Sequence, residues 1–531
     1  MKPVKLISGF MTVGFWTLAS RVLGFARDIM IASFLGTGAV AEAFLVAFSL
    51  PNMFRRFFAE GAFNTAFVPL FSKKLQKGED PVGFAQDAFS GLATLLILFT
   101  LVAQLVMPWL VLAMASGFRG DVRFDLAVDF GRITFAYILF ISLAALLSGV
   151  LNASGRFAAA AAAPVLLNVI LVSALLLGES GVFGSVSDPP SPEVAGLSQG
   201  TILAWGTLIA GVAQMGLVWI AAKHAGFKLL PRRPRLTPDL KRLAFIAAPA
   251  MLAGGVVQIN LLVGRQVASF FDGAIAWLSY ADRLYQLPLG VVGIAVGIVL
   301  LPDLSRRLAA EDEAGSQYAL SRAAEISLAL TIPSAVALVA IPLPLVSVLF
   351  ERGAFDFEDS QATALAVAVY GLGLPAFVMQ KVLQPLYFAR EDTRTPFRFA
   401  VVAMVVNAAT AILCAYLFGF IGAAMGTTIA GWAMVLLLAV GTKGMGRSAR
   451  FDSRFHARIW RIILASLLMG ALLWGLATVM EPWLYSATVR YPALAVLVVS
   501  GIVSYFAVGQ IVGAFRVAEF KNALRRSPKA P

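Results

Sequence analysis

The sequence has few side chains suited to redox or metal chemistry. Its single cysteine, Cys414, lies in an apolar stretch, so no internal disulfide is expected. The two histidines, His224 and His456, lie in basic polar stretches, whereas a zinc site needs several such ligands together. The phosphate-binding pattern G-x-x-x-x-G-K-[ST] does not occur either. No cofactor is therefore expected, and ATP hydrolysis is not expected to be the energy source.

Charged residues are scarce as well. They make up 13% of the 531 residues, where soluble globular proteins have about 25%, and hydrophobic residues reach 59% against roughly 45 to 50%. This composition argues against a water-soluble multidomain enzyme. The net charge is +13, from 42 Lys and Arg against 29 Asp and Glu. In so apolar a chain these cations are expected beside a membrane, and no nucleic-acid partner is expected.

Long apolar runs, by contrast, recur along the whole chain. A helix needs about 20 predominantly apolar residues to cross a hydrocarbon core of roughly 30 Å, because lipid offers no partner for free backbone groups. We therefore predict an all-α integral membrane protein with fourteen transmembrane helices, near residues 8–35, 39–71, 87–116, 126–152, 157–178, 197–222, 243–271, 274–304, 319–350, 361–389, 396–417, 420–442, 458–480 and 491–515.

The positions of the cations agree with this helix count. When the runs are taken as alternating spans, 30 of the 42 Lys and Arg residues fall on one side of the membrane. The opposite loops hold four, namely Arg119, Arg123, Arg352 and Arg490. Because Lys and Arg accumulate on the cytoplasmic side, both termini are expected in the cytoplasm. Arg21 and Arg27 interrupt the first run, which we interpret as a retained span and not as a signal peptide.

A short pattern occurs twice, at an offset of 233 residues. Residues 69–75 read PLFSKKL and residues 302–308 read PDLSRRL, each at the end of an apolar run. Since the offset corresponds to six helices, a binding site is expected between two similar lobes, near the middle of the bilayer. The predicted organisation is a lobe of six helices at 1–222, a basic cytoplasmic linker at 223–242, a second six-helix lobe at 243–442, and helices 13 and 14 with a basic tail at 443–531.

Charged residues inside the apolar runs mark the candidate site. Each costs at least about 2.5 to 3.5 kcal/mol in lipid, so the set is expected to face a watery cavity or to be paired. The cations exceed the acids by eight to four. A surplus of guanidinium suits phosphate, which accepts bidentate hydrogen bonds, so the substrate is expected to be anionic. The set consists of Arg21, Arg27, Arg55, Arg56, Arg132, Arg265, Arg283 and Lys381, with the acids Asp28, Glu42, Glu60 and Asp282.

Helical spacing groups several of these residues. Asn52, Arg56 and Glu60 follow one another at intervals of four and share one helix face. Asp282 and Gln286 repeat this spacing in the second half of the chain. A proline lies close to each group and favours a bend in its helix.

A purely structural interpretation stays open beside the functional one. In it, Arg56 pairs with Glu60, and Arg283 pairs with Asp282, so that these charges neutralise one another inside the protein. Three further intramembrane cations then extend toward the membrane surface along their apolar stems. These are Arg132, Arg265 and Lys381.

Three motifs resemble those of one known family. They are SRVLGFARD at residues 20–28, LPNMFRRFFAEGAF at 50–63 and YADRL at 280–284. Together they closely resemble the MurJ (MviN) family, the lipid II flippases of bacterial cell-wall synthesis, and the resemblance covers the whole chain. It implies the fold of the multidrug/oligosaccharidyl-lipid/polysaccharide exporter superfamily, in which two six-helix lobes surround a central cavity that opens alternately to either side.

The resemblance also implies roles for individual residues. Arg27, Arg55 and Arg283 resemble the cavity arginines that hold a pyrophosphate, and Asp28 resembles the acid that positions them. Helices 13 and 14 resemble the pair that forms a groove for a long polyprenyl tail, which explains why they fall outside the repeat.

Further residues complete the predicted substrate-binding set. Arg21, Arg56 and Glu60 match positions that the family needs for function. Glu42 stands where the family commonly has aspartate, which keeps the charge on a longer side chain. The polar residues that the helical spacing adds to this set are Asn52 and Asp282.

The expected function is the translocation of lipid II, a disaccharide-pentapeptide on undecaprenyl pyrophosphate, to the outer leaflet of the bacterial cytoplasmic membrane. The chain is expected to be a transporter and not an enzyme. Its expected partners are the lipid-linked pyrophosphate, the membrane and a cell-wall synthesis complex. The alternatives are a flippase for another polyprenyl-pyrophosphate oligosaccharide of the O-antigen or capsule type, a cation-coupled drug exporter, which needs acids in surplus, and a membrane glycosyltransferase, which needs catalytic carboxylates.

Overall fold

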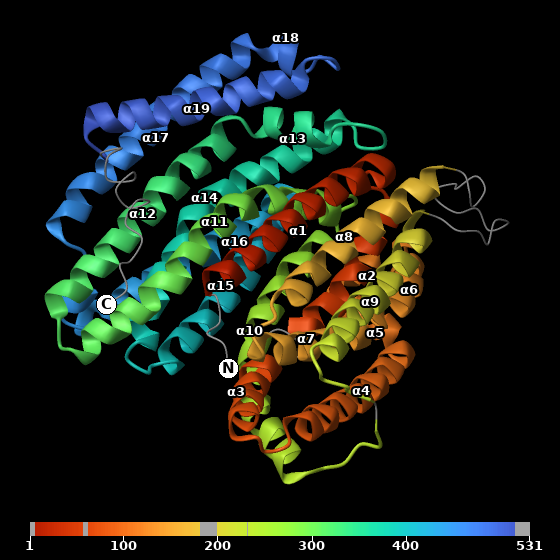
Figure 1. Ribbon diagram of the computed structural model, residues 1–531. Helices are drawn as coiled ribbons and strands as arrows, with labels where there is room; N and C mark the ends of the chain where they lie inside the picture. Colours follow the sequence, from red (N-terminus) through yellow and green to blue (C-terminus); the bar gives the residue numbers. More distant parts are fainter. Residues whose placement is uncertain (1–5, 57–61, 181–198, 231, 516–531) are drawn as a thin grey trace. The chain divides into compact units, whose positions relative to one another are not determined.

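The described part of the chain consists of helices and connecting turns (Figure 1). The computed structural model describes residues 6–56, 62–180, 199–230 and 232–515. Within these residues no strand occurs, and the one isolated bridge joins Arg352 to Phe355. The predicted all-α fold is confirmed. Two compact units make up the chain: unit 1 holds Met1–Ala276 and Arg352–Phe355, and unit 2 holds Trp277–Glu351 and Asp356–Pro531.

Unit 1 contains the first ten α-helices. Helix α8 packs against both α1 and α9, α2 packs against α6, and α10 packs against α3. The predicted linker lies between α9 and α10. The helices are α1 (Leu6–Leu35), α2 (Ala39–Arg55), α3 (Ala62–Lys77), α4 (Pro81–Leu105), α5 (Met107–Met114), η2 (Ser116–Phe118), α6 (Val122–Phe135), α7 (Tyr137–Ala153), α8 (Ala158–Glu179), α9 (Gln199–His224) and α10 (Pro238–Ala268).

Unit 2 contains the remaining helices, of which α11 begins a few residues before the boundary. Helix α14 packs against α12 and α16, and α17 packs against α12 and α19. The helices are α11 (Ala274–Ala309), α12 (Glu313–Ala340), α13 (Pro342–Phe350), α14 (Phe357–Phe388), α15 (Arg394–Phe418), η3 (Gly419–Ile421), α16 (Gly422–Gly441), η4 (Thr442–Gly444), η5 (Arg447–Ala449), α17 (Ser453–Val479), α18 (Glu481–Leu484) and α19 (Arg490–Val512).

Each predicted apolar run coincides with one helix or with two consecutive ones. The run at 39–71 corresponds to α2 and α3, and the run at 319–350 to α12 and α13. In the described part of the chain, nine helical stretches are long and apolar enough to cross a membrane. Helices α1, α2 and α11, which carry the charged motifs, are not among them. The count of fourteen spans stays a prediction.

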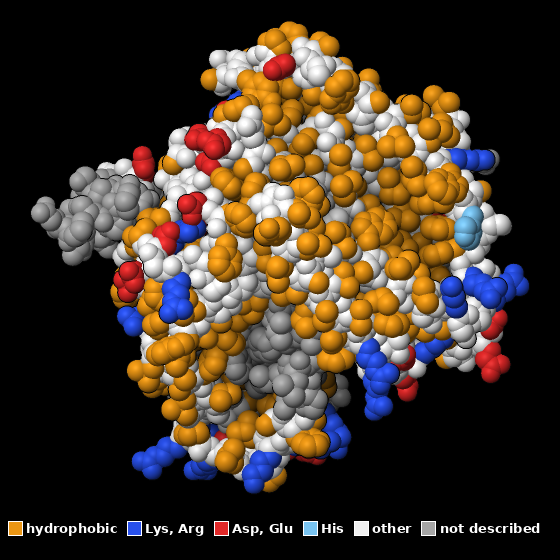
Figure 2. Space-filling view, turned by 180° about the vertical axis from the view of Figure 1, so that it is seen from behind, with side chains coloured by type: hydrophobic (Ala, Val, Ile, Leu, Met, Phe, Trp, Pro, Cys, Tyr) orange, Lys and Arg blue, Asp and Glu red, His pale blue; other side chains and the backbone are white. Residues whose placement is uncertain are grey.

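The surface of the molecule is apolar over wide areas. Hydrophobic side chains cover most of the face in Figure 2, and Lys and Arg lie mainly around its margin. Leu105 on α4, Tyr416 on α15 and Trp474 on α17 are exposed by 77%, 88% and 64%. Soluble monomers rarely expose large contiguous apolar patches, whereas a lipid-facing surface does. The chain is therefore a multi-pass membrane protein.

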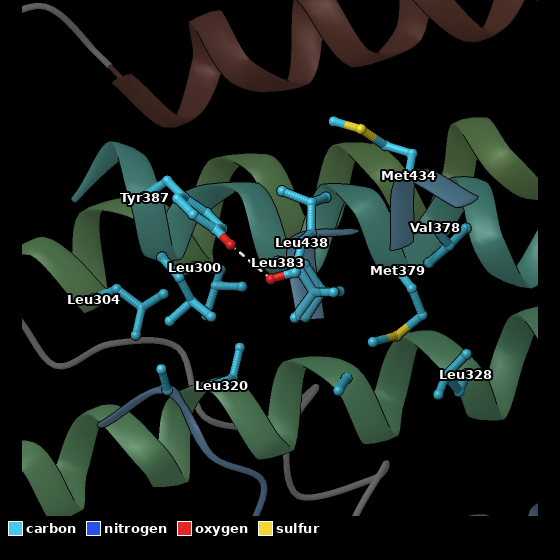
Figure 3. Packing of buried hydrophobic residues seen from close by; sticks show 14 of the residues in the cluster. Leu300, Leu304, Leu320, Leu328, Val378, Met379, Leu383, Tyr387, Met434 and Leu438 are labelled. Carbon is cyan, nitrogen blue, oxygen red and sulfur yellow. Dashed lines mark hydrogen bonds between the residues drawn. The ribbon is translucent and has the colours of Figure 1, made fainter. Parts of the chain in front are cut away.

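A buried cluster joins several helices of unit 2. Figure 3 shows side chains of α11, α12, α14 and α16 packed together, among them Leu300, Leu320 and Leu383. The Tyr387 hydroxyl lies inside this cluster and donates a hydrogen bond of 2.6 Å to the carbonyl oxygen of Leu438. A buried hydroxyl without a partner is costly, so this bond lets a tyrosine fill an otherwise apolar core.

An ionic network connects α17 to α12. Glu325 of α12 is 7% exposed and accepts hydrogen bonds from Arg322, from Arg458 at 2.5 Å and from Arg454 at 3.4 Å. Arg322 also donates to both carboxylate oxygens of Asp452, at 2.8 and 2.6 Å. Asp452 in turn caps α17 at its first turn. Within unit 2, α17 is thus joined to α12 by charge pairs as well as by apolar packing.

The linker between α9 and α10 is held against α4. The side chain of Arg232 donates to Asp87 at 2.8 Å and to the carbonyl oxygen of Gly83 at 2.6 Å. Its backbone N–H donates to the Ser90 hydroxyl at 3.0 Å. Leu229, three residues earlier, is fully buried. The part of the predicted basic linker around Arg232 is therefore anchored to the first turns of α4.

Candidate functional site

Two residues of the first motif form a buried ion pair in α1. Arg27 and Asp28 are each 6% exposed, and Nη2 of Arg27 lies 2.7 Å from Oδ1 of Asp28. Nε of Arg27 donates to the same oxygen at 3.0 Å, and Nη1 donates to Oδ1 of Asn168 at 3.0 Å. The guanidinium also lies 5.6 Å from the ring centre of Phe48 on α2. The predicted pair is thus inside unit 1, where its charges are compensated.

Asn168 of α8 is a partner of Arg27 that the sequence reasoning missed. Its side chain is buried, and Nδ2 donates to the carbonyl oxygen of Ser20 at 2.9 Å. A Cβ at Gly24 would lie 3.4 Å from that nitrogen, at an ordinary van der Waals distance, so Asn168 packs closely against this turn of α1. Asn168 therefore ties Arg27 to the preceding turns of α1. The available signal was that Asn168 is the one amide in α8, since an amide in an apolar span needs a partner.

The second motif lies at the end of α2 and is described in part. Asn52 donates from Nδ2 to the carbonyl oxygen of Phe48 at 2.8 Å, within the same helix. Arg55, the last residue of α2, is half-buried, and Arg56 after it is exposed. Glu60 lies outside the described residues. On α1, Arg21 is exposed as well, so unit 1 offers cations at different depths.

Glu42 has partners other than the arginines of the first two motifs. It is 1% exposed and accepts hydrogen bonds from Nη1 of Arg123 and from the backbone N–H of Ile275, both at 2.9 Å. Arg123 also pairs with Asp121 at 2.9 Å and with Asp272 at 2.7 Å. The sequence reasoning placed Arg123 in a loop and gave it no role. The structure makes it the centre of an ionic cluster that joins α2, α6 and the turn before α11.

Asp121 lies at the edge of this cluster and caps α6. Its side chain accepts a hydrogen bond of 2.9 Å from the backbone N–H of Arg123. Partial burial alone would raise the pKa of Asp121, but the hydrogen bonds and the positive charge of Arg123 outweigh it and lower the pKa below its ordinary value. The carboxylate is therefore ionised at neutral pH and keeps its pair with Arg123.

The third motif places polar side chains on α11, in unit 2. Arg283 and Gln286 are exposed, and Asp282 is half-buried. Nε2 of Gln286 donates a hydrogen bond to Oδ2 of Asp282. The ring of Tyr285 between them packs against Tyr370 of α14, with centroids 5.0 Å apart. The four-residue spacing predicted from the sequence thus corresponds to a direct contact.

The guanidinium of Arg27 has donors beyond its observed contacts. A guanidinium carries five N–H donors, and the three hydrogen bonds to Asp28 and Asn168 leave two of them for a further acceptor. Phosphate oxygens match such a fork in geometry and charge. In the part of the chain that the structure describes, no group of three or more His, Cys, Asp or Glu could hold a metal ion.

The helical architecture is shared with a class of membrane transporters. A solved inward-facing multidrug resistance MATE family transporter of the MOP superfamily superposes with a TM-score of 0.64 at 15% identity, over 81% of this chain and 95% of that one. A solved lipid II flippase MurJ, in an inward closed conformation, gives a TM-score of 0.76 at 26% identity, over 97% of this chain and all of that one. The fold is that of the MOP-superfamily transporters.

Sequence comparison is more specific. The profile of the family described as lipid II flippase MurJ matches residues 31–493, and the chain belongs to this family. A probable lipid II flippase MurJ of Rhizobium tropici is 41% identical over 535 residues, which cover 99% of this chain and 98% of that protein. Its counterpart in Rhizobium meliloti is 42% identical over 534 residues, with the same coverage. The resemblance inferred from the three motifs is confirmed.

Proposed function

We propose that this chain translocates lipid II from the inner to the outer leaflet of the bacterial cytoplasmic membrane. The observation that carries this proposal is the similarity, along nearly the whole chain, to proteins named as lipid II flippases. The chain is a transporter and not an enzyme, and its substrate is a lipid within the membrane. The proposal includes that the chain belongs to a cell-wall synthesis complex.

The pyrophosphate of the substrate is assigned to Arg27, Arg55 and Arg283. Support comes from the two donors that Arg27 keeps after its contacts with Asp28 and Asn168, and from the exposure of Arg283 on a membrane helix. Asp28 orients Arg27. The further substrate-binding residues in this proposal are Arg21, Glu42, Asn52, Arg56, Glu60 and Asp282.

Transport proceeds by alternating access, with both termini in the cytoplasm. In this arrangement the lobes at 1–222 and 243–442 change their orientation around the bound head group, and the helices after residue 443 hold the polyprenyl tail. An inside-negative potential favours outward movement of an anion by about 2.3 kcal/mol per charge per 100 mV. This term can drive net flipping of a pyrophosphate-linked lipid without nucleotide hydrolysis.

The test is transport of labelled lipid II in proteoliposomes. The wild-type protein is expected to move the lipid, and Arg27→Ala is expected to slow transport by about tenfold or more, because a hydrogen bond to a charged group contributes roughly 1.5 to 3 kcal/mol. Arg119→Ala, which removes an exposed arginine, is the control. Failure of the wild type to move lipid II would overturn the function. Equal rates for the wild type and Arg27→Ala would remove that arginine from the mechanism.

A further inference from the structure

The exposed polar side chains of α11 need an explanation of their own. The helix has 36 residues, which is more than enough to cross a bilayer, and Arg283 and Gln286 on it are exposed. A charged side chain that faces lipid costs several kcal/mol, so such residues face water-filled space in membrane proteins. This part of α11 therefore offers polar groups to a soluble head group and not to lipid tails.

Asp282 and Gln286 form a preorganised pair on this helix. Nε2 of Gln286 donates to the Asp282 carboxylate, and Tyr285 lies between these two residues in the sequence. Tyr285 is itself held by aromatic contacts with Tyr370 and Phe377 of α14, at 5.0 and 5.7 Å between ring centroids. Gln286 thus holds the carboxylate on a helix turn that these ring contacts fix in place. The bond uses one of the two amide hydrogens of Gln286, so its amide oxygen and second hydrogen stay available.

The chemistry of this pair does not suit phosphate. A carboxylate repels an anion, whereas it accepts hydrogen bonds from hydroxyl groups, and an amide both donates and accepts. Sugar rings carry neighbouring hydroxyl and acetamido groups that need such a combination. We propose that Asp282 and Gln286 form a subsite that binds the disaccharide of the head group. This inference rests on the proposed function.

The order of residues along α11 agrees with the order of groups in the substrate. In lipid II the sugar is attached directly to the pyrophosphate, so the two groups must be bound next to each other. Arg283, which is assigned to the pyrophosphate, follows Asp282 in the sequence and precedes Gln286 by three residues. Arg283 therefore lies between the two hydroxyl-binding residues, Asp282 and Gln286, within about one turn of helix. Such a turn distinguishes a glycosylated pyrophosphate from a bare one.

Binding measurements with three lipids test the subsite. Dissociation constants of the full-length protein in nanodiscs are measured for undecaprenyl pyrophosphate, for its disaccharide derivative without peptide, and for lipid II. Gln286→Ala is expected to weaken binding of both sugar-bearing lipids roughly fivefold to tenfold, because about one hydrogen bond is lost. Its affinity for undecaprenyl pyrophosphate is expected to equal that of the wild type, which also shows that the variant is folded.

Controls separate this inference from the proposed function. Gln361→Ala, which removes an exposed glutamine near the start of α14, is expected to bind all three lipids like the wild type. The subsite is overturned if Gln286→Ala weakens all three lipids equally, if it weakens none, or if it weakens lipid II alone, which indicates a contact with the peptide. If the wild type binds none of the lipids, the proposed function itself fails.

Discussion

At the scale of single residues, Asn168 is an uncharged partner of Arg27. Its oxygen accepts from Arg27 and its nitrogen donates to Ser20, so Asn168→Ala removes a partner from each. We expect this variant to transport lipid II roughly fivefold to tenfold more slowly in proteoliposomes, because Arg27 keeps its charge but loses part of its orientation. Asn152→Ala, at an exposed position of α7, is the control, and equal rates for both variants would contradict this role.

Arg123 is expected to matter for stability. Its removal leaves Glu42 buried without its ion-pair partner, and breaking a buried pair in this way costs about 3 to 5 kcal/mol. Arg123→Ala should therefore lower the thermal unfolding midpoint in detergent, whereas Arg119→Ala, at an exposed position nearby, should leave it unchanged. Partial recovery of the midpoint in Arg123→Ala combined with Glu42→Gln would show that the uncompensated charge is the cause.

The sequence predicted which charged residues lie in the helices, but not all of their partners. The cost of a charge in lipid is enough to single out Arg27 and Asp28. It does not show that Arg123, assigned to a loop, pairs with Glu42 across 81 residues of chain, because that contact depends on how α2 and α6 pack. Asn168 is uncharged, so it stands out less in an apolar run, and its contact with Arg27 likewise depends on how the helices pack.

At the scale of elements, the linker before α10 is expected to be ordered by one arginine. Arg232→Ala removes the side-chain hydrogen bonds to Asp87 and Gly83, whereas Arg233, its neighbour, is exposed. Hydrogen exchange of peptides from residues 226–237 should become faster in Arg232→Ala and stay at the wild-type rate in Arg233→Ala. Similar exchange in the two variants would show that apolar burial of Leu229 is sufficient to hold the linker.

Helix positions were predicted well and helix interruptions were not. Apolar length and charge locate every run, because crossing a membrane leaves little freedom in composition. Breaks inside a run, such as the one between α12 and α13 at Ile341, depend on local backbone angles that leave the average hydropathy unchanged. The proline at the start of α13 was visible in the sequence, yet prolines also occur inside α2 and α11 without ending them.

At the scale of the whole molecule, the orientation in the membrane is open to a direct test. The chain has one cysteine, and Cys414 is buried, so a second cysteine can be labelled selectively. In intact cells a membrane-impermeant thiol reagent should modify Thr488→Cys, after α18, and should modify His224→Cys, at the end of α9, only after permeabilisation. The reverse pattern would place the termini outside the cell. The parent protein with Cys414 alone controls for background.

The repeat in the sequence and the contacts in the structure divide the chain at different residues. The repeat separates the halves after residue 222, whereas the contact-defined units separate at Ala276. Helix α10 accounts for the difference, because its packing against α3, α4 and α5 places it in unit 1. A repeat records similarity between segments, and packing depends on which surfaces meet, so the two need not agree.

The charge pairs between α12 and α17 restrict how the chain can be shortened. A version that ended before residue 443 would leave Glu325 with one of its three arginines and Arg322 without Asp452, on a helix face that α17 otherwise covers. Deleting the last helices is therefore expected to destabilise the remaining protein, unless apolar residues replace Arg322 and Glu325 at the same time. Any truncated form made for crystallisation or for functional dissection should carry both replacements.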